Sequence, residues 1–227
     1  MPSNFSCLDD FSNSLAEVQI ILKQAEKKHE NTKEYNICIK SALLFLVAKF
    51  EAFLEDLVTE YIHAIENKNL NHSSLPKVLK LHAIDKIIDE KFLSDVWNHK
   101  ANAIQTIEKL AKLCVGDQKI DLIEIDKKFD YGKHGQKAIN TLFSRIGVDN
   151  VFSECKIYEK QESLIGKNRI EINITADINS LTFFRNNILH DDMTPSITHP
   201  QITTYKKHLL KFSKKLDKTL AAKLNGM

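Results

Sequence analysis

The segment from Tyr35 to Glu66 constrains the fold more than any other part of this sequence. Its apolar residues recur three and four positions apart, as on one face of a helix, and the stretch from Leu44 to Ala48 is hydrophobic nearly all round. Such a helix must be covered by protein on several sides, so we predict that it is the central helix of a bundle. Its main stripe consists of Leu43, Phe50, Leu54, Leu57, Tyr61 and Ile65.

Two further amphipathic helices are predicted near the ends of the chain. Between Phe5 and Ala25 the apolar residues again fall three and four apart. Near the other end, Thr198 is the expected N-cap of a final helix, with Pro200 in its first turn and Gln201 at the capping-box position. The core stripe of this helix is Ile202, Tyr205, Leu209, Phe212, Leu216, Leu220 and Leu224.

Shorter helices are predicted in the middle of the chain. Ser73 or Ser74 is expected to cap a helix that continues to Phe92, and another helix is expected from about Asp95 to Cys114, ending at Gly116. After an irregular stretch, the sequence GQKAINTLFSRIG is typical of a short helix closed by a glycine. The alternating isoleucines of RIEINIT then predict an extended arm or a hairpin.

The composition favours helices over a β-sandwich. The 227 residues include only six glycines and four prolines, so turn-forming residues do not recur at the spacing of short strands. A chain that is 43% hydrophobic and 27% charged is ordinary globular material of a length that suits one domain. We therefore predict a single all-α domain over residues 1–227, a helical bundle with an irregular or hairpin insertion at roughly 115–175.

Cysteine usage and hydropathy bear on the location of the protein. Cys7, Cys38, Cys114 and Cys155 are scattered and form no CxxC pair, which favours reduced thiols over a disulfide framework or a zinc site. The N-terminus lacks a basic patch followed by an apolar block, and the longest strictly apolar run, Ala42 to Ala48, is too short to span a bilayer. A cytoplasmic location without membrane contact is expected.

Charge is unevenly distributed along the chain. The net charge is +2, but the last 27 residues, from Gln201 on, hold seven lysines and one acid and so carry +6, which leaves −4 for the rest. Lys206, Lys207 and Lys211 of this basic helix are candidate phosphate contacts for RNA, although a lysine-rich helix face is as often simply solvated.

A single arginine, Arg185, interrupts an apolar helix face. In the helix predicted from about Asp177 to His190, Arg185 falls within the arc formed by Ile178, Leu181, Phe184, Ile188 and Leu189. Burial of an unpaired guanidinium costs several kcal/mol, so Arg185 should meet a carboxylate or face a cleft that admits a polyanion. Glu51, at the margin of the central helix, is a candidate partner. Asn186 and His190 share one face and can border the same cavity if the helix unwinds slightly at His190.

These residues resemble the signature of a known family. Arg185 followed by Asn186 and then His190 is similar to the Arg-x4-6-His motif of HEPN domains, all-helical modules that include many metal-independent RNases. The segments SALLFLVAKFEAFLEDLV and GKHGQKAINTLFSRIGVDNVF look like the central helix and the middle segment of stand-alone HEPN nucleases of the RiboL-PSP type. The likeness extends from about Ser41 to the end. One departure is Asp191, where many relatives carry a small residue.

The resemblance implies a function and a role for each residue. His190 would act in acid–base catalysis while a substrate 2′-hydroxyl attacks the adjacent phosphate, and Arg185 would hold that phosphate. Asn186 would orient the histidine or the scissile group, with Glu51 as a further partner. The family's site usually forms across a two-fold homodimer. RNA is the implied substrate, no cofactor or metal is implied, and a toxin or antiviral-defence role with an antitoxin or defence-system partner is expected.

Other interpretations remain open from the sequence. Arg185 and Glu51 are also consistent with a structural buried ion pair, and a non-catalytic helical module that dimerises or binds a partner is the main alternative to an enzyme. His190, Asp191 and Asp192 are a weak metal-binding pattern, since no second spaced cluster of ligands accompanies them. The other eight histidines are isolated in sequence and are expected to be solvated or structural.

Overall fold

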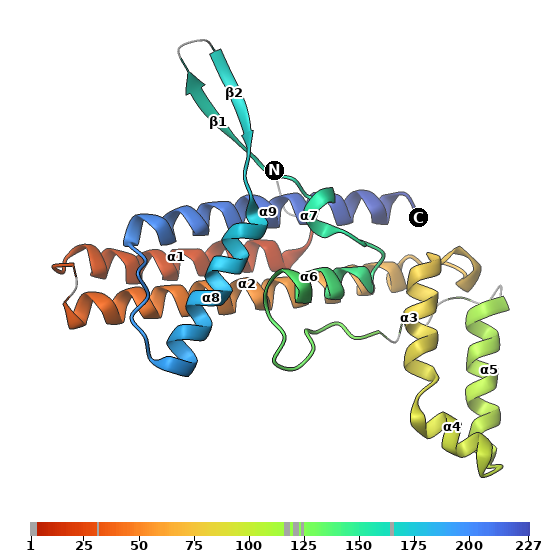
Figure 1. The fold of residues 1–227 in the computed structure, drawn as a ribbon. Coiled ribbons are helices and arrows are strands. Elements are labelled where there is room, and N and C mark those ends of the chain that lie inside the picture. Colours follow the sequence, from red (N-terminus) through yellow and green to blue (C-terminus); the bar gives the residue numbers. More distant parts are fainter. Residues whose placement is uncertain (1–3, 31, 116–118, 120–122, 124, 164–165) are drawn as a thin grey trace.

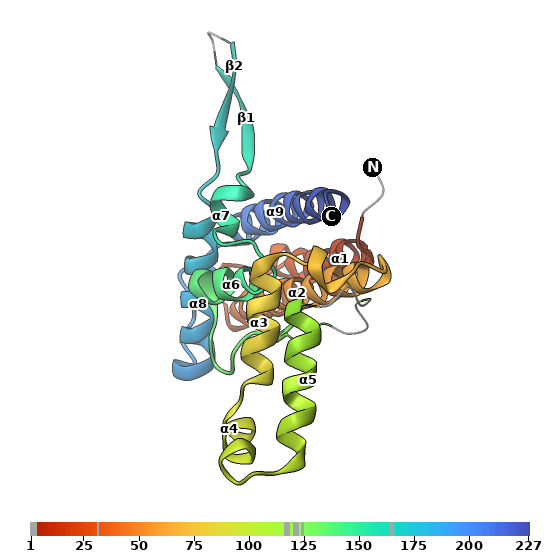
Figure 2. The ribbon, with the colours of Figure 1, turned by 90° about the vertical axis from the view of Figure 1, so that its right-hand side faces the viewer.

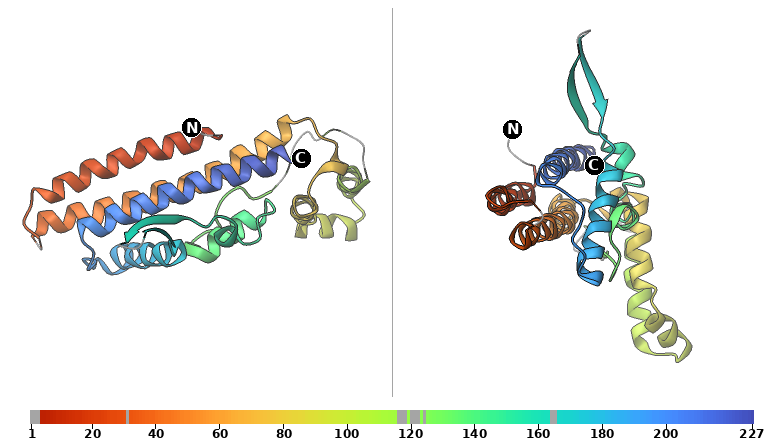
Figure 3. Two further views of the ribbon diagram at one scale, coloured as in Figure 1. Left: turned by 90° about the horizontal axis from the view of Figure 1, so that it is seen from above. Right: turned by 60° about the vertical axis from the view of Figure 1, so that its left-hand side comes forward.

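In a computed structural model, which describes residues 4–30, 32–115, 119, 123, 125–163 and 166–227, the chain forms a helical bundle with one small hairpin. Three long helices lie side by side (Figure 1; Figure 3, right). They are α1 (Ser6–Glu26), α2 (Lys33–Asn67) and α9 (His199–Asn225). None of the helices described is long and apolar enough to cross a membrane. The prediction of an all-α bundle is confirmed.

Helix α2 is the buried centre, as its sequence pattern predicts. Every residue of its predicted stripe is buried. Phe53 stacks on Phe11 of α1 with 5.1 Å between ring centroids, and Phe50 lies 6.4 Å from Phe212 of α9. Burial of several aromatic rings at one junction supplies much of the apolar area that holds the three helices together.

Helices α8 (Ile174–Asp191) and α6 (Gly135–Ser144) form a second layer that packs on α2, with α8 crossing the long helices (Figure 1). The Asn173 side chain caps α8 by accepting the Ala176 N–H at 3.1 Å. At the other end, Asp192 adopts a left-handed conformation with φ 47°. Lys40 of α2 donates to the Asp192 carbonyl at 2.8 Å and to its carboxylate at 2.7 Å. These contacts fix the end of α8 against the central helix.

The final helix also follows its sequence signals. In the capping box, the Thr198 N–H donates to Gln201 Oε1 at 2.8 Å, and Pro200 lies in the first turn. The short helix α6 was likewise predicted, and Gly147 beyond its end has φ +82°. A one-turn helix, α7 (Val151–Glu154), follows it.

The predicted middle helices are placed differently by the structure. Ser73 and Ser74 lie in a 3-10 turn, η1 (His72–Ser74), and Pro76, not a serine, precedes α3 (Lys77–Ile87). The predicted helix to Phe92 breaks because the Asp89 carboxylate accepts the Phe92 N–H at 2.7 Å and starts a new helix, α4 (Glu90–Trp97).

A second break was also missed in this region. The predicted helix from Asp95 is interrupted after α4, because His99 takes a left-handed conformation with φ 55°, and α5 runs only from Ala101 to Val115. The predicted end at Gly116 lies outside the described residues. Helices α3 to α5 project from one end of the bundle (Figure 1).

The isoleucine alternation marks a hairpin, as predicted, but its bounds differ. Strand β1 (Tyr158–Ser163) pairs antiparallel with β2 (Gly166–Glu171), and Ile174, predicted to be extended, already begins α8. The hairpin points away from the bundle in the direction opposite to α3–α5 (Figure 2).

Candidate active site

A pocket of about 1040 Å³ opens where α6 meets α8. Arg185, Asn186 and His190 of α8 all line it, opposite His134 and Lys137 from the start of α6. The three α8 residues reach the pocket without any unwinding at His190, because α8 stays helical to Asp191. Leu189, predicted to belong to the buried arc, is instead 53% exposed and also lines the pocket.

Arg185 is half-buried and has no acidic partner among the described residues. Its Nη1 donates to Asn186 Oδ1 at 3.0 Å. The chain's other two arginines are engaged elsewhere, since Arg145 pairs with Asp130 at 2.6 Å and Arg169 lies 5.4 Å from the centre of the Tyr158 ring. A guanidinium in an open pocket without a carboxylate is available to an anionic ligand.

Glu51 has a different partner from the one expected. Its Oε1 lies 2.8 Å from Nδ1 of His134, and both side chains are about a quarter exposed, 22% for Glu51 and 25% for His134. The proposed pair between Glu51 and Arg185 is therefore replaced by a carboxylate–imidazole pair. Glu51 reaches the site through His134, which lines the pocket.

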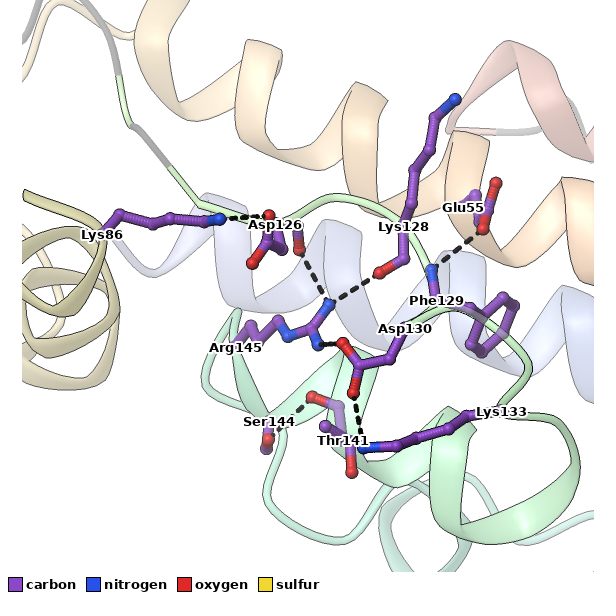
Figure 4. Close-up of polar contacts among 10 residues, drawn as sticks. All are labelled: Glu55, Lys86, Asp126, Lys128, Phe129, Asp130, Lys133, Thr141, Ser144 and Arg145. Atoms are coloured by element: carbon purple, nitrogen blue, oxygen red, sulfur yellow. Dashed lines mark hydrogen bonds and ion pairs between the residues drawn. The ribbon is translucent and has the colours of Figure 1, made fainter. Parts of the chain in front are cut away.

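The loop before α6, residues 126–133, is held rigidly by polar contacts (Figure 4). Arg145 donates to the carbonyl of Lys128 at 2.7 Å and to the Asp130 carboxylate at 2.6 Å. The Phe129 N–H donates to Glu55 Oε1 of α2 at 2.9 Å. Hydrogen bonds from Lys133 and Arg145 lower the pKa of Asp130. These contacts hold the loop that leads to His134, which lines the pocket.

Gly135 lets the start of α6 approach α8 closely. Its φ is +80°, a conformation that favours glycine, and a Cβ built there would lie 3.2 Å from Thr182 Oγ1 of α8. Thr182 is held by its own hydrogen bond to the Ile178 carbonyl at 2.9 Å. The glycine therefore sets the distance between His134, which precedes it, and the α8 side of the pocket.

The C-terminal end of α8, which includes the motif histidine, faces solvent. His190 and Asp191 are exposed in the last turn of α8. Asp192 pairs with Lys40, and that hydrogen bond lowers the pKa of its carboxyl. Within the described ranges, no group of three or more His, Cys, Asp or Glu side chains is arranged to hold a metal ion.

The candidate RNA-binding lysines of α9 lie outside this pocket. Lys206 donates to Gln19 of α1, and burial lowers its pKa. Lys207 and Lys211 both bind Glu159 at the base of the hairpin, the latter at 3.1 Å. These three ammonium groups therefore already have protein partners.

Sequence reasoning missed the side of the pocket that α6 supplies. The start of α6 and the residues before it bring two ammonium groups and one imidazole to the site, from Lys133, Lys137 and His134. No acidic residue is among the described residues that line the pocket. The available signal was the stretch GKHGQK, in which two glycines flank a histidine just before a helix. From the sequence, His134 is among the histidines expected to be solvated or structural, and the structure adds that it lines this pocket and pairs with Glu51.

Comparison with known proteins assigns the family. The family model described as RiboL-PSP-HEPN matches residues 9–222, nearly the whole chain. No curated protein and no solved structure matches the chain significantly. The chain belongs to the RiboL-PSP-HEPN family, as the arginine–histidine motif suggested.

Proposed function

We propose that this RiboL-PSP-HEPN protein is a metal-independent endoribonuclease whose active site is the pocket between α6 and α8. In the proposed reaction the substrate 2′-hydroxyl oxygen attacks the neighbouring phosphorus, and the bond from phosphorus to the 5′-oxygen breaks. The products are a 2′,3′-cyclic phosphate and a 5′-hydroxyl end. No water is consumed in this step, and protons move between the substrate and imidazole groups.

One observation carries the proposal: among the described residues Arg185 has no acidic partner, and it lies in an open pocket that it shares with His190. The guanidinium is suited to bind the phosphate and to stabilise the negative charge that builds up on its oxygens. The imidazole of His190 is a group that can transfer a proton without a metal. Asn186, bonded to Arg185, holds the guanidinium in orientation.

Positive charge around the pocket supports an RNA substrate. Lys133 and Lys137 line it beside Arg185, and they favour a phosphate backbone over a neutral ligand. Lys206, Lys207 and Lys211 stay secondary candidates, because RNA must displace their present contacts before they bind phosphate.

A homodimer is part of the proposal. Exposed apolar side chains lie on α8 and just after its end, with Phe183 60%, Leu189 53% and Met193 54% exposed, and Leu189 lines the pocket. Exposed large apolar side chains that lie close together in the chain are typical of a surface covered by another protein. A second copy placed there brings two pockets together, as the family resemblance implies. Sedimentation analysis of the wild type and of Phe183→Glu tests this: we expect a dimer that the charge disrupts.

A role as a toxin or antiviral-defence effector follows only from the family, and with it an antitoxin or defence-system partner. The second candidate function is a non-catalytic module that dimerises or binds a partner protein. The same exposed apolar side chains favour it, because they fit a binding surface whether or not the pocket is catalytic.

The test is cleavage of single-stranded RNA in the presence of EDTA by the wild type, Arg185→Ala and His190→Ala. We expect the wild type to cleave and each variant to lose roughly 10²-fold or more in rate. Loss of wild-type cleavage in EDTA contradicts the proposal. Cleavage by both variants at the wild-type rate also contradicts it. A folded dimer that cleaves no RNA favours the partner-binding function instead.

A further inference from the structure

We infer that His134 is a second catalytic histidine of this site, acting as the general base opposite His190, and that Glu51 is its positioning residue. This inference rests on the proposed function. It adds a residue that lies 56 positions before His190 and on another helix, outside the arginine–histidine motif.

The need for a second proton-transfer group comes from the reaction itself. The attacking 2′-hydroxyl must lose a proton while the departing 5′-oxygen must gain one, and a single imidazole is poorly placed to do both on opposite sides of the phosphorus. The pocket offers two imidazoles from one chain. His190 stands on α8, and His134 stands before α6 on the facing wall.

The contacts of His134 are those of an oriented base. Glu51 Oε1 lies 2.8 Å from Nδ1, so the carboxylate holds the Nδ1 proton and leaves the lone pair on Nε2. Within the part of the chain that the structure describes, Nε2 has no hydrogen-bond partner. Because Glu51 of α2 engages Nδ1 and His134 lines the pocket, we assign Nε2 to the pocket side of the ring.

The contacts around His134 hold the pair of His134 and Glu51 in place, as expected for a functional pair rather than for a freely solvated side chain. The preceding loop is anchored by Arg145 and Glu55, and Gly135 allows the tight contact with Thr182. The anchoring contacts lie at Lys128 to Asp130, four to six residues before His134, and at Gly135, directly after it. A histidine that merely caps α6 explains less, because its side chain makes no capping hydrogen bond to that helix.

The proton balance assigns the roles. The neutral Nε2 of His134 accepts the 2′-hydroxyl proton as the oxygen–phosphorus bond forms, and the resulting imidazolium is stabilised by Glu51. Protonated His190 gives its proton to the 5′-oxygen as the bond to phosphorus breaks. Arg185 neutralises charge on the non-bridging oxygens throughout. Proton exchange with solvent restores both histidines.

Charged groups of each neighbouring element face this pair. Helix α2 contributes Glu51, the loop contributes Lys133, α6 contributes Lys137 and α8 contributes Arg185 and His190. Apart from Glu51, these groups are cations or the second imidazole. Among the described residues, Glu51 is the carboxylate that contacts His134, and it stabilises the charged form of His134 during the reaction.

The first test compares His134→Asn with a matched control, His208→Asn. Asparagine can still donate to Glu51 but cannot transfer a proton. His208 of α9 makes the same type of pair, with Nδ1 2.6 Å from Asp177 Oδ2, and it does not line the pocket. We expect His134→Asn to lose roughly 10²-fold or more in kcat with unchanged affinity for 2′-O-methyl RNA, which cannot be cleaved, and His208→Asn to retain activity.

The second test separates base from acid with uridine 3′-(4-nitrophenyl phosphate), whose leaving group needs no proton. His190→Ala should recover activity on this substrate relative to RNA, whereas His134→Asn should not. Glu51→Gln should lower kcat without raising KM, and the double variant with His134→Asn should be no slower than His134→Asn alone, because Glu51 acts through that histidine.

The outcomes distinguish this inference from the proposed function. If His134→Asn cleaves RNA as fast as the wild type, the inference about His134 is overturned, while the proposed endoribonuclease function stands. Recovery of His134→Asn, and not of His190→Ala, on the nitrophenyl substrate overturns the role assignment. Absence of any wild-type cleavage, with folding confirmed by circular dichroism, overturns both.

Discussion

Substitution of Gly135 by alanine tests whether the close approach of α6 to α8 builds the pocket. Gly135 and Gly147 have nearly the same left-handed backbone, with φ +80° and +82°. They differ in their surroundings, because a Cβ at Gly147 meets nothing within 4 Å, whereas a Cβ at Gly135 meets Thr182 Oγ1 at 3.2 Å. Gly147→Ala therefore isolates the backbone cost from the crowding cost.

The magnitudes follow from these two contributions. A left-handed conformation costs a residue with a Cβ about 1–2 kcal/mol, so Gly147→Ala should lower the free energy of unfolding by that amount. Gly135→Ala should lower it by about 1 kcal/mol more, since one contact is too tight and Thr182 must move by a few tenths of an ångström. Chemical denaturation at equilibrium measures both values.

A double variant tests the source of the extra cost. Thr182→Ala removes the Oγ1 and Cγ2 atoms, which lie 3.2 Å and 3.5 Å from the position of the added Cβ. In combination with Gly135→Ala it should recover about 1 kcal/mol relative to the sum of the single effects. RNA cleavage should fall for Gly135→Ala, because His134 moves, and should be retained by Gly147→Ala. Equal destabilisation by both single variants, with additive behaviour of the double variant, would refute the reasoning.

Three further predictions concern other parts of the molecule. Hydrogen bonds from Lys207 and Lys211 lower the pKa of Glu159 from 4.5 to about 2. The stabilising contribution of the Glu159 carboxylate is therefore present above pH 4.5 and is lost as the pH falls toward 2. The difference in Tm between the wild type and Glu159→Gln should shrink over that range. Burial raises the pKa of the Cys7 and Cys155 thiols, whereas Cys114 is exposed. A thiol reagent should therefore label Cys114 quickly and should label Cys7 and Cys155 only after unfolding. The substitution Cys114→Ser should remove the fast phase of labelling. Lys133→Ala with Lys137→Ala should weaken RNA binding and lower its log–log salt slope by up to about two, whereas Lys207→Ala with Lys211→Ala should change the slope less, because the first two lysines line the pocket and the other two lie outside it. Equal slopes for the two pairs would contradict the assignment of the pocket as the RNA site.

The sequence by itself determined the helical framework, because periodicity and capping are local properties. The all-round apolar character of Leu44 to Ala48 required a central helix, and the Thr198 capping box located the last helix. The spacing of Arg185, Asn186 and His190 placed three side chains along one stretch of helix, and they do line one pocket. Interruptions of helices were less visible, since the break at Asp89 depends on a side-chain cap that competes with a continuous apolar pattern.

Only the tertiary structure decided what stands opposite Arg185. Glu51 and His134 are 83 residues apart, and no local pattern relates them; their contact exists because the loop before α6 is anchored to α2 and because Gly135 lets α6 touch α8. From the sequence, Arg185 was the expected partner of Glu51. In the folded chain Glu51 pairs with His134 instead, and no carboxylate in the part of the chain that the structure describes pairs with Arg185. Long-range packing of this kind is set by the whole fold rather than by residues near in sequence.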